Sequence, residues 1–125
     1  MDIRIIKAGT DRLKKKPGDN DNLNFGDIFT DHMFVMDYKE GRGWYNARIT
    51  PYGSFQIEPA AMGIHYAQEI FEGLKAYRGI NGDIYLFRPE ENIKRFNTSA
   101  ARVCMPGVDE NIFMEGMNKV VLLDR

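Results

Sequence analysis

Arg95 is the charged side chain with the clearest potential for a binding role. It lies between Ile93 and Phe96, which have the spacing of the buried face of a helix. A guanidinium beside a buried stripe needs an acid or an anion as its partner, because an unpaired buried charge is costly. The planar set of N–H donors suits a phosphate or a carboxylate. Two interpretations follow from the residues: an anion site, and a surface or structural ion pair.

Three aromatic residues form a second candidate: Phe25, Tyr66 and Phe71 lie in or next to predicted loops rather than at strand centres. Two of them are close to glycines, Gly26 and Gly73. Aromatic side chains beside glycines can form the wall of an apolar pocket. Ordinary core packing is the alternative interpretation.

The other reactive residue types do not form a catalytic set. His32 and His65 have no partner at the spacing of a metal site, so each is interpreted as a hydrogen-bonded structural residue. Cys104 is interpreted as a small buried apolar side chain near the end of a helix. Glycine-rich phosphate-binding motifs are absent.

Composition predicts a soluble protein with one hydrophobic core. The chain has 125 residues, 43% apolar and 28% charged, with a net charge of −1, so nothing indicates nucleic acid. One cysteine excludes an internal disulfide, and the charged N-terminus and short apolar runs are unlike a signal peptide or a membrane span. We therefore expect a cytoplasmic protein. The basic run Lys14–Lys16 is expected to lie in a solvated loop.

The first half of the chain reads mainly as strands. An edge strand is expected within residues 2–7, followed by an exposed polar arm up to residue 24. Residues 29–38 and 44–49 flank a glycine-containing turn and predict a β-hairpin. Residues 54–58 alternate like a third strand. A short helix is expected within residues 62–72, with Gly73 as its end.

The second half predicts a hairpin and two helices. Residues 74–79 and 83–87 flank Asn81-Gly82, a pair that suits a two-residue turn with positive φ at both positions. Pro89 opens a helix whose apolar stripe is Ile93, Phe96, Ala100 and Val103, and Pro106-Gly107 is expected to break it. Asp109 is the expected cap of a last helix, whose stripe is Phe113, Met117, Val120 and Val121. The fold class is therefore α+β, with a mainly antiparallel sheet and hairpins covered by helices.

Three runs of sequence resemble the branched-chain amino acid aminotransferases, a family of fold-type-IV pyridoxal phosphate enzymes. They are FGDIFTDHMFVMDY (25–38), HYAQEIFEGLKAYRG (65–79) and IYLFRPEENIKRFNTSAARVCMP (84–106), in the family's order and approximate spacing. The resemblance implies that residues 25–125 form the family's small N-terminal domain. A strand and a flexible polar arm (1–24) precede it, and the large cofactor-binding domain is absent. It also implies a homodimer in the full-length enzyme.

The resemblance implies roles for the candidate residues. Arg95 matches the family's arginine to the phosphate of pyridoxal 5′-phosphate, and Phe25, Tyr66 and Phe71 match the aromatic wall around the substrate's aliphatic chain. Arg88, also within the matched motif, is given a structural role. The implied reaction transfers the amino group of leucine, isoleucine or valine to 2-oxoglutarate, in branched-chain amino acid biosynthesis.

The resemblance also implies that this chain alone is inactive. The family's Schiff-base lysine lies in the large domain, and no lysine of this chain is in the matching segment. The expected catalytic set within the chain is therefore empty. Two alternatives remain: another fold-type-IV enzyme, such as a D-amino acid aminotransferase, and a non-catalytic stand-alone binding module.

Overall fold

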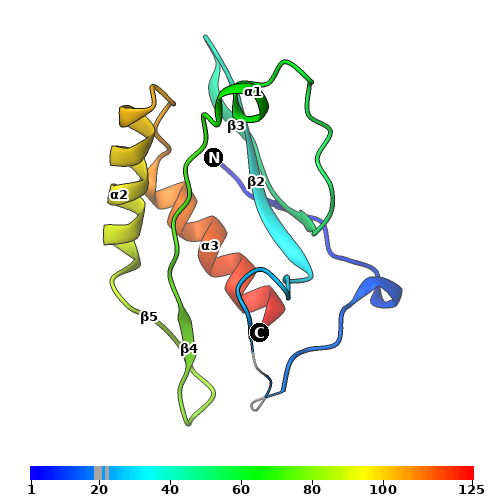
Figure 1. The fold of residues 1–125 in the computed structure, drawn as a ribbon. Helices are drawn as coiled ribbons and strands as arrows, with labels where there is room; N and C mark the ends of the chain where they lie inside the picture. The colour runs from blue at the N-terminus through cyan, green and yellow to red at the C-terminus, as the bar shows by residue number, and fades with distance from the viewer. Residues whose placement is uncertain (19–20, 22) are drawn as a thin grey trace. The chain divides into compact units, whose positions relative to one another are not determined.

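The structure is a computed structural model that describes residues 1–18, 21 and 23–125 (Figure 1). The chain forms two compact units, one made of Met1–Ser54 with Gly116–Arg125, and the other of Phe55–Glu115. Both contain helix and paired strands, which confirms the predicted α+β class.

The first unit is built on a three-stranded sheet. Its strands are β1 (Arg4–Ile5), β2 (His32–Lys39) and β3 (Gly43–Pro51), in the order β1-β3-β2. β2 and β3 form an antiparallel hairpin, whereas β1 lies parallel to β3 at the edge. The predicted first hairpin and edge strand are therefore confirmed.

The turn and the core of this hairpin follow from residue type. Arg42 N donates to Lys39 O at 3.0 Å, and Gly41 has a φ of 79°, a backbone conformation that favours glycine. Along β3, Ala47 and Ile49 are buried, and two-residue spacing places both on one face of the sheet. Ile49 is completely buried and is the centre of this core.

The last helix, α3 (Glu110–Asp124), starts at the predicted cap. The Asp109 carboxylate accepts from the backbone N–H groups of Asn111 and Ile112 at 2.9 and 3.0 Å. Farther along, Gly116 packs closely on Phe34 of β2, because a Cβ atom there would lie 2.5 Å from the ring. A glycine at this position lets the helix approach the strand closely.

A polar cluster holds the N-terminal segment, which includes the short 3₁₀ helix η1 (Thr10–Arg12), against this unit. His32 Nδ1 lies 2.6 Å from Asp124 Oδ1, and Asp124 Oδ2 accepts from His32 N at 2.9 Å. His32 Nε2 accepts from Ala8 N at 2.9 Å, so the ring proton is on Nδ1 and the ring is neutral. Both side chains are buried, which confirms the structural interpretation of His32.

The second unit contains α1 (Met62–Tyr66), a hairpin, α2 (Pro89–Arg102) and the first turns of α3. The hairpin strands are β4 (Ala76–Arg78) and β5 (Ile84–Leu86), paired antiparallel, as predicted.

The turn of this hairpin differs from the prediction. Gly79 N donates to Asp83 O, and Gly82 N donates to Gly79 O, so three residues form the loop. Only Gly82 of the Asn81-Gly82 pair has positive φ. A turn followed by one left-handed glycine is the common form of a three-residue hairpin loop.

α2 has the predicted apolar stripe, of which Ile93 and Ala100 are buried and Phe96 and Val103 are half-buried. Pro89 is at its start, and Ile93 and Ala100 are buried one above the other. The rings of Phe96 and Phe113 lie 5.2 Å apart between centroids, so α2 packs against the first turns of α3. The remaining core residues of this unit are Val108 and Ile112.

The end of α2 corrects two predictions. The helix stops at Arg102, before Pro106-Gly107, because Cys104 adopts a left-handed φ of 57°. Met105 N donates to Ala100 O and Cys104 N to Ala101 O, which is the hydrogen-bond pattern of a Schellman motif. Cys104 is exposed there rather than buried.

Two other predictions are wrong. Residues 54–58 are exposed and belong to no strand, because strand-like alternation without a neighbouring strand forms no ladder. α1 ends at Tyr66 rather than at Gly73, because Ala67 takes the left-handed conformation at φ 49°.

Candidate functional site

Arg95 projects from the outer face of α2 into a pair with an acid. Its Nε donates to Glu72 Oε1 at 2.5 Å, and its Nη2 donates to Glu72 Oε2 at 2.7 Å. The Arg95 side chain is 66% exposed, whereas that of Glu72 is only 14% exposed. Arg95 is therefore a surface arginine held from one side by a well-covered carboxylate.

Asn92 fixes the carboxylate from the same helix. Its Nδ2 donates to Glu72 Oε2 at 3.0 Å and to Gly73 O at 2.9 Å. Asn92 and Arg95 are three residues apart, so both project from one face of α2. The hydrogen bonds from Arg95, with a smaller contribution from Asn92, lower the pKa of Glu72 from 4.5 to about 2. Glu72 in turn raises the pKa of Arg95.

The pairing leaves part of the guanidinium available. Glu72 occupies the side edge, formed by Nε and one N–H of Nη2. A guanidinium has five N–H donors, and Nη1 donates no hydrogen bond within the described residues. The outer edge, formed by Nη1 and Nη2, can therefore donate two parallel hydrogen bonds to one anion. Such an edge fits one contact to a phosphate ester.

The three aromatic candidates are all on the surface. Phe25 is 102% exposed, Phe71 is 86% exposed and Tyr66 is 75% exposed, so the alternative that they are ordinary core residues is wrong. Phe25 belongs to the first unit, and Tyr66 and Phe71 belong to the second. Phe71 directly precedes Glu72 in sequence, which places it beside the residue that holds Arg95. Their role as a pocket wall stays a prediction.

Arg88 has a clear structural position at the start of α2. It is the residue before Pro89 and has a left-handed φ of 48°. Its carbonyl accepts from Glu91 N at 3.1 Å, which closes the first turn of the helix.

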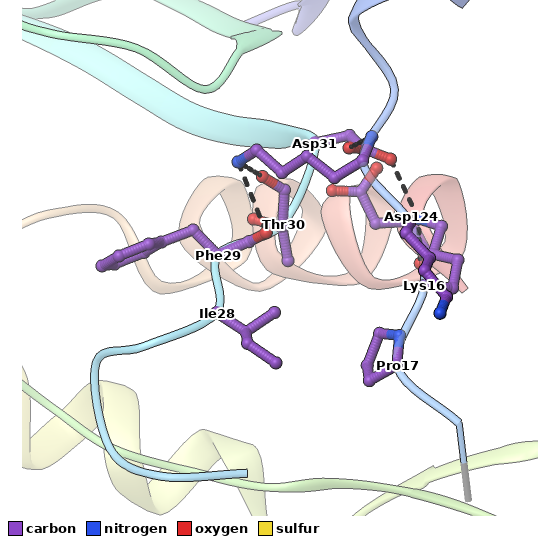
Figure 2. Close-up of a pocket in the computed structure, with 9 residues that line it drawn as sticks. Lys16, Pro17, Ile28, Phe29, Thr30, Asp31 and Asp124 are labelled. Atoms are coloured by element: carbon purple, nitrogen blue, oxygen red, sulfur yellow. Dashed lines mark hydrogen bonds and ion pairs between the residues drawn. The ribbon is translucent and has the colours of Figure 1, made fainter. Parts of the chain in front are cut away.

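A separate pocket of about 200 Å³ lies in the first unit (Figure 2). Its polar groups are engaged with one another: Lys14 Nζ donates to Thr30 O at 2.7 Å, and Lys16 Nζ donates to Asp31 Oδ2 at 3.0 Å and Asp124 O at 2.9 Å. Hydrogen bonds from Lys14 N and Lys16 lower the pKa of Asp31. The expectation that Lys14–Lys16 lie in a solvated loop is confirmed, because all three are exposed and outside any helix or strand. In addition, the ammonium groups of Lys14 and Lys16 donate to backbone carbonyls and a carboxylate.

Two further properties apply to the described part of the chain. It contains no group of three or more His, Cys, Asp or Glu residues that could hold a metal ion. None of its helices combines the length and the apolar composition needed to cross a membrane.

Sequence reasoning did not identify Glu72 or Asn92. The three-residue spacing of Asn92 and Arg95 places them on one helix face, which is a weak signal of shared function. Glu72 lies outside any helix or strand, in a segment whose path depends on tertiary packing, so no sequence period indicates it.

Comparison with known proteins gives consistent results along the whole chain. The branched-chain-amino-acid aminotransferase 2 of Bacillus subtilis (strain 168) is 46% identical over 125 residues, which is 100% of this chain and 34% of that protein. The branched-chain-amino-acid transaminase 1 of the same strain is 49% identical, covering 100% of this chain and 35% of that protein. A branched-chain-amino-acid aminotransferase of Mycobacterium tuberculosis (strain CDC 1551 / Oshkosh) is 41% identical, covering 98% of this chain and 33% of that protein.

No family model matches the chain. The chain spans about a third of the length of the curated relatives that it matches, and the matched part is their first third. Identity of this level over every residue cannot come from a shared fold alone. The chain is therefore a homologue of the branched-chain-amino-acid aminotransferases and corresponds to the N-terminal third of such a protein.

Proposed function

We propose that this chain is the N-terminal domain of an enzyme that transfers the amino group of leucine, isoleucine or valine to 2-oxoglutarate. The observation that carries the proposal is the identity of 41–49% to proteins of that name along essentially the whole chain. The proposal includes pyridoxal 5′-phosphate as cofactor. When bound, this group supplies an electron sink for chemistry at the substrate's α-carbon.

Arg95 and the aromatic residues have separate tasks in this proposal. The outer edge of Arg95 binds the cofactor's phosphate, which the free donors of that edge support. Phe25, Tyr66 and Phe71 contact the branched aliphatic chain of the substrate, and their high exposure leaves them accessible. Burying each CH₂ of that chain is worth about 0.8 kcal/mol, so an aromatic wall favours leucine over alanine.

The rest of the proposal concerns the whole enzyme. Residues 25–125 form its small domain after a polar arm (1–24), and a large domain supplies the catalytic lysine and most of the phosphate site. The enzyme is a cytoplasmic homodimer that acts in branched-chain amino acid biosynthesis. These properties are supported by the family resemblance of the three sequence runs.

A chimeric enzyme tests the proposal. This chain replaces the matching third of the Bacillus subtilis aminotransferase 2, and the purified chimera is loaded with pyridoxal phosphate. We expect glutamate formation from 2-oxoglutarate with L-leucine, L-isoleucine and L-valine. With D-alanine and 2-oxoglutarate, we expect little formation of pyruvate. Turnover of D-alanine in place of L-leucine would instead favour a D-amino acid aminotransferase.

The isolated 125-residue chain is the matched control. Mixed with pyridoxal phosphate, L-leucine and 2-oxoglutarate, it should form glutamate no faster than free pyridoxal phosphate does. Faster turnover would show that a lysine of this chain is catalytic, and Lys75 and Lys94, which lie in the matched runs, would be substituted first.

A further inference from the structure

We propose that Glu72 is a positioning residue: it holds Arg95 by one edge so that the opposite edge is preset for the cofactor's phosphate. The inference rests on the proposed function of Arg95 and adds a residue to which no role has been assigned. Asn92 in turn holds Glu72 in place through a hydrogen bond to its carboxylate.

The first step is the anchoring of Glu72. Its carboxylate accepts three hydrogen bonds, two from Arg95 and one from Asn92, and it is far less exposed than the arginine. Asn92 also binds the carbonyl of Gly73, so residues 72 and 73 are both tied to α2. A carboxylate held at this many points defines the direction of the guanidinium that it binds.

The second step is what this direction provides. An unrestrained arginine on a helix surface samples many rotamers and must lose that freedom when it binds a ligand. The bidentate contact with Glu72 restricts the rotamers of the Arg95 side chain before any ligand binds. The edge formed by Nη1 and Nη2 then points away from Glu72, and its two parallel N–H groups match two oxygens of a phosphate.

An opposing effect sets the sign of the test. The negative charge of Glu72 repels a phosphate, so charge alone predicts that removing Glu72 would tighten binding. That repulsion acts across an exposed guanidinium, where water and salt screen it. The loss of orientation acts directly on the contact itself. Positioning therefore predicts weaker phosphate binding when Glu72 is neutralised, which is opposite to the electrostatic expectation.

The experiment uses the chimeric enzyme and measures dissociation constants for pyridoxal phosphate and for pyridoxal by absorbance titration. The ratio of the two constants isolates the phosphate contact, because a general defect in folding weakens both ligands alike. Glu72→Gln should lower the preference for pyridoxal phosphate by roughly two- to tenfold, the cost of freezing one long side chain. Asn92→Ala should lower it by less.

Glu91→Gln is the matched control. Glu91 is also on α2 and pairs only with Lys94, at 3.0 Å, among the described residues. Its substitution removes the same charge without touching Arg95, and we expect no loss of preference. If Glu72→Gln prefers pyridoxal phosphate over pyridoxal as strongly as the parent enzyme does, or more strongly, the inference is overturned.

Arg95→Ala separates the two proposals. If it leaves the preference unchanged, Arg95 does not bind the phosphate and the proposed function of this residue fails. If it lowers the preference while Glu72→Gln does not, only the positioning role fails. In the Arg95→Ala background, Glu72→Gln should no longer weaken phosphate binding.

A second measurement applies to the 125-residue chain and does not need the chimera to fold. In ¹⁵N spectra, the Nε–H of Arg95 should give a distinct, slowly exchanging signal that collapses to the position of free arginine in Glu72→Gln. A signal that is unchanged by the substitution shows that Glu72 does not hold the arginine, and it overturns the inference.

Discussion

Substituting Gly116 with alanine tests the close contact between α3 and β2. In an open helix position, glycine to alanine stabilises by about 1 kcal/mol. Here the added Cβ would lie 2.5–2.6 Å from three carbons of the Phe34 ring, whereas ordinary carbon contacts are about 3.5–4.0 Å. The ring or the helix must therefore withdraw by about 1 Å.

Overpacking of this kind costs about 1–3 kcal/mol, which exceeds the gain in helix propensity. We expect Gly116→Ala to lower the free energy of unfolding by about 1 kcal/mol, or the Tm by about 3–5 °C. Trp44, the only tryptophan, lies on β3, so its fluorescence follows urea unfolding of the first unit.

Two companion variants make the test decisive. Asn118→Ala, at an exposed position on α3, should stabilise by about 0.5 kcal/mol through propensity alone. Phe34→Leu removes the ring, so adding Gly116→Ala to it should stabilise rather than destabilise. If Gly116→Ala in the parent chain raised stability by the propensity amount, the close contact would not exist and the reasoning would be refuted.

Three further substitutions or titrations follow from the structure. His32→Ala should destabilise the first unit by about 2 kcal/mol, because buried Asp124 Oδ1 loses the hydrogen bond from Nδ1, although the backbone N–H of residue 32 still donates to Oδ2. His65→Ala, at an exposed site, should change the free energy of unfolding by less than about 0.5 kcal/mol in the same urea titration. Cys104→Gly should stabilise the second unit by about 1 kcal/mol in a thermal scan, since glycine adopts the left-handed conformation at the helix end without a steric penalty. A loss of stability would show that contacts of the Cys104 side chain stabilise the fold by more than the left-handed backbone conformation costs. The Glu72 carboxyl should titrate near pH 2 in ¹³C spectra, so the pairing contributes fully above pH 4.5 and is lost as the pH falls through about 2; Arg95→Gln should return the titration toward 4.5.

Local signals were sufficient for most of the fold. The two hairpins, the proline start of α2 and the Asp109 cap all depend on residues within a few positions of one another. The predictions of where two helices end were wrong because the residues at those ends are of unusual type. Ala67 and Cys104 end helices in a conformation that glycine usually adopts, so neither type signals a helix end.

The candidate site shows the same division. Arg95 was identified because its neighbours have a helical period, but its partner Glu72 is 23 residues earlier in an irregular segment. The role of Lys14 and Lys16 was missed for the same reason, since their acceptors are 15 to 108 residues away. Periodicity describes a face of an element and carries no information about which loop covers it.

The division of the chain into a discontinuous and a continuous unit has a consequence for its synthesis. Residues 1–54 leave the ribosome first, yet Phe34 and His32 have their partners at Gly116 and Asp124. The continuous unit, residues 55–115, has its own core residues available earlier. The residues of the second unit are therefore all available before the first unit can be completed. The face of β2 that packs on Gly116 stays uncovered until α3 is synthesised, when aggregation competes with folding.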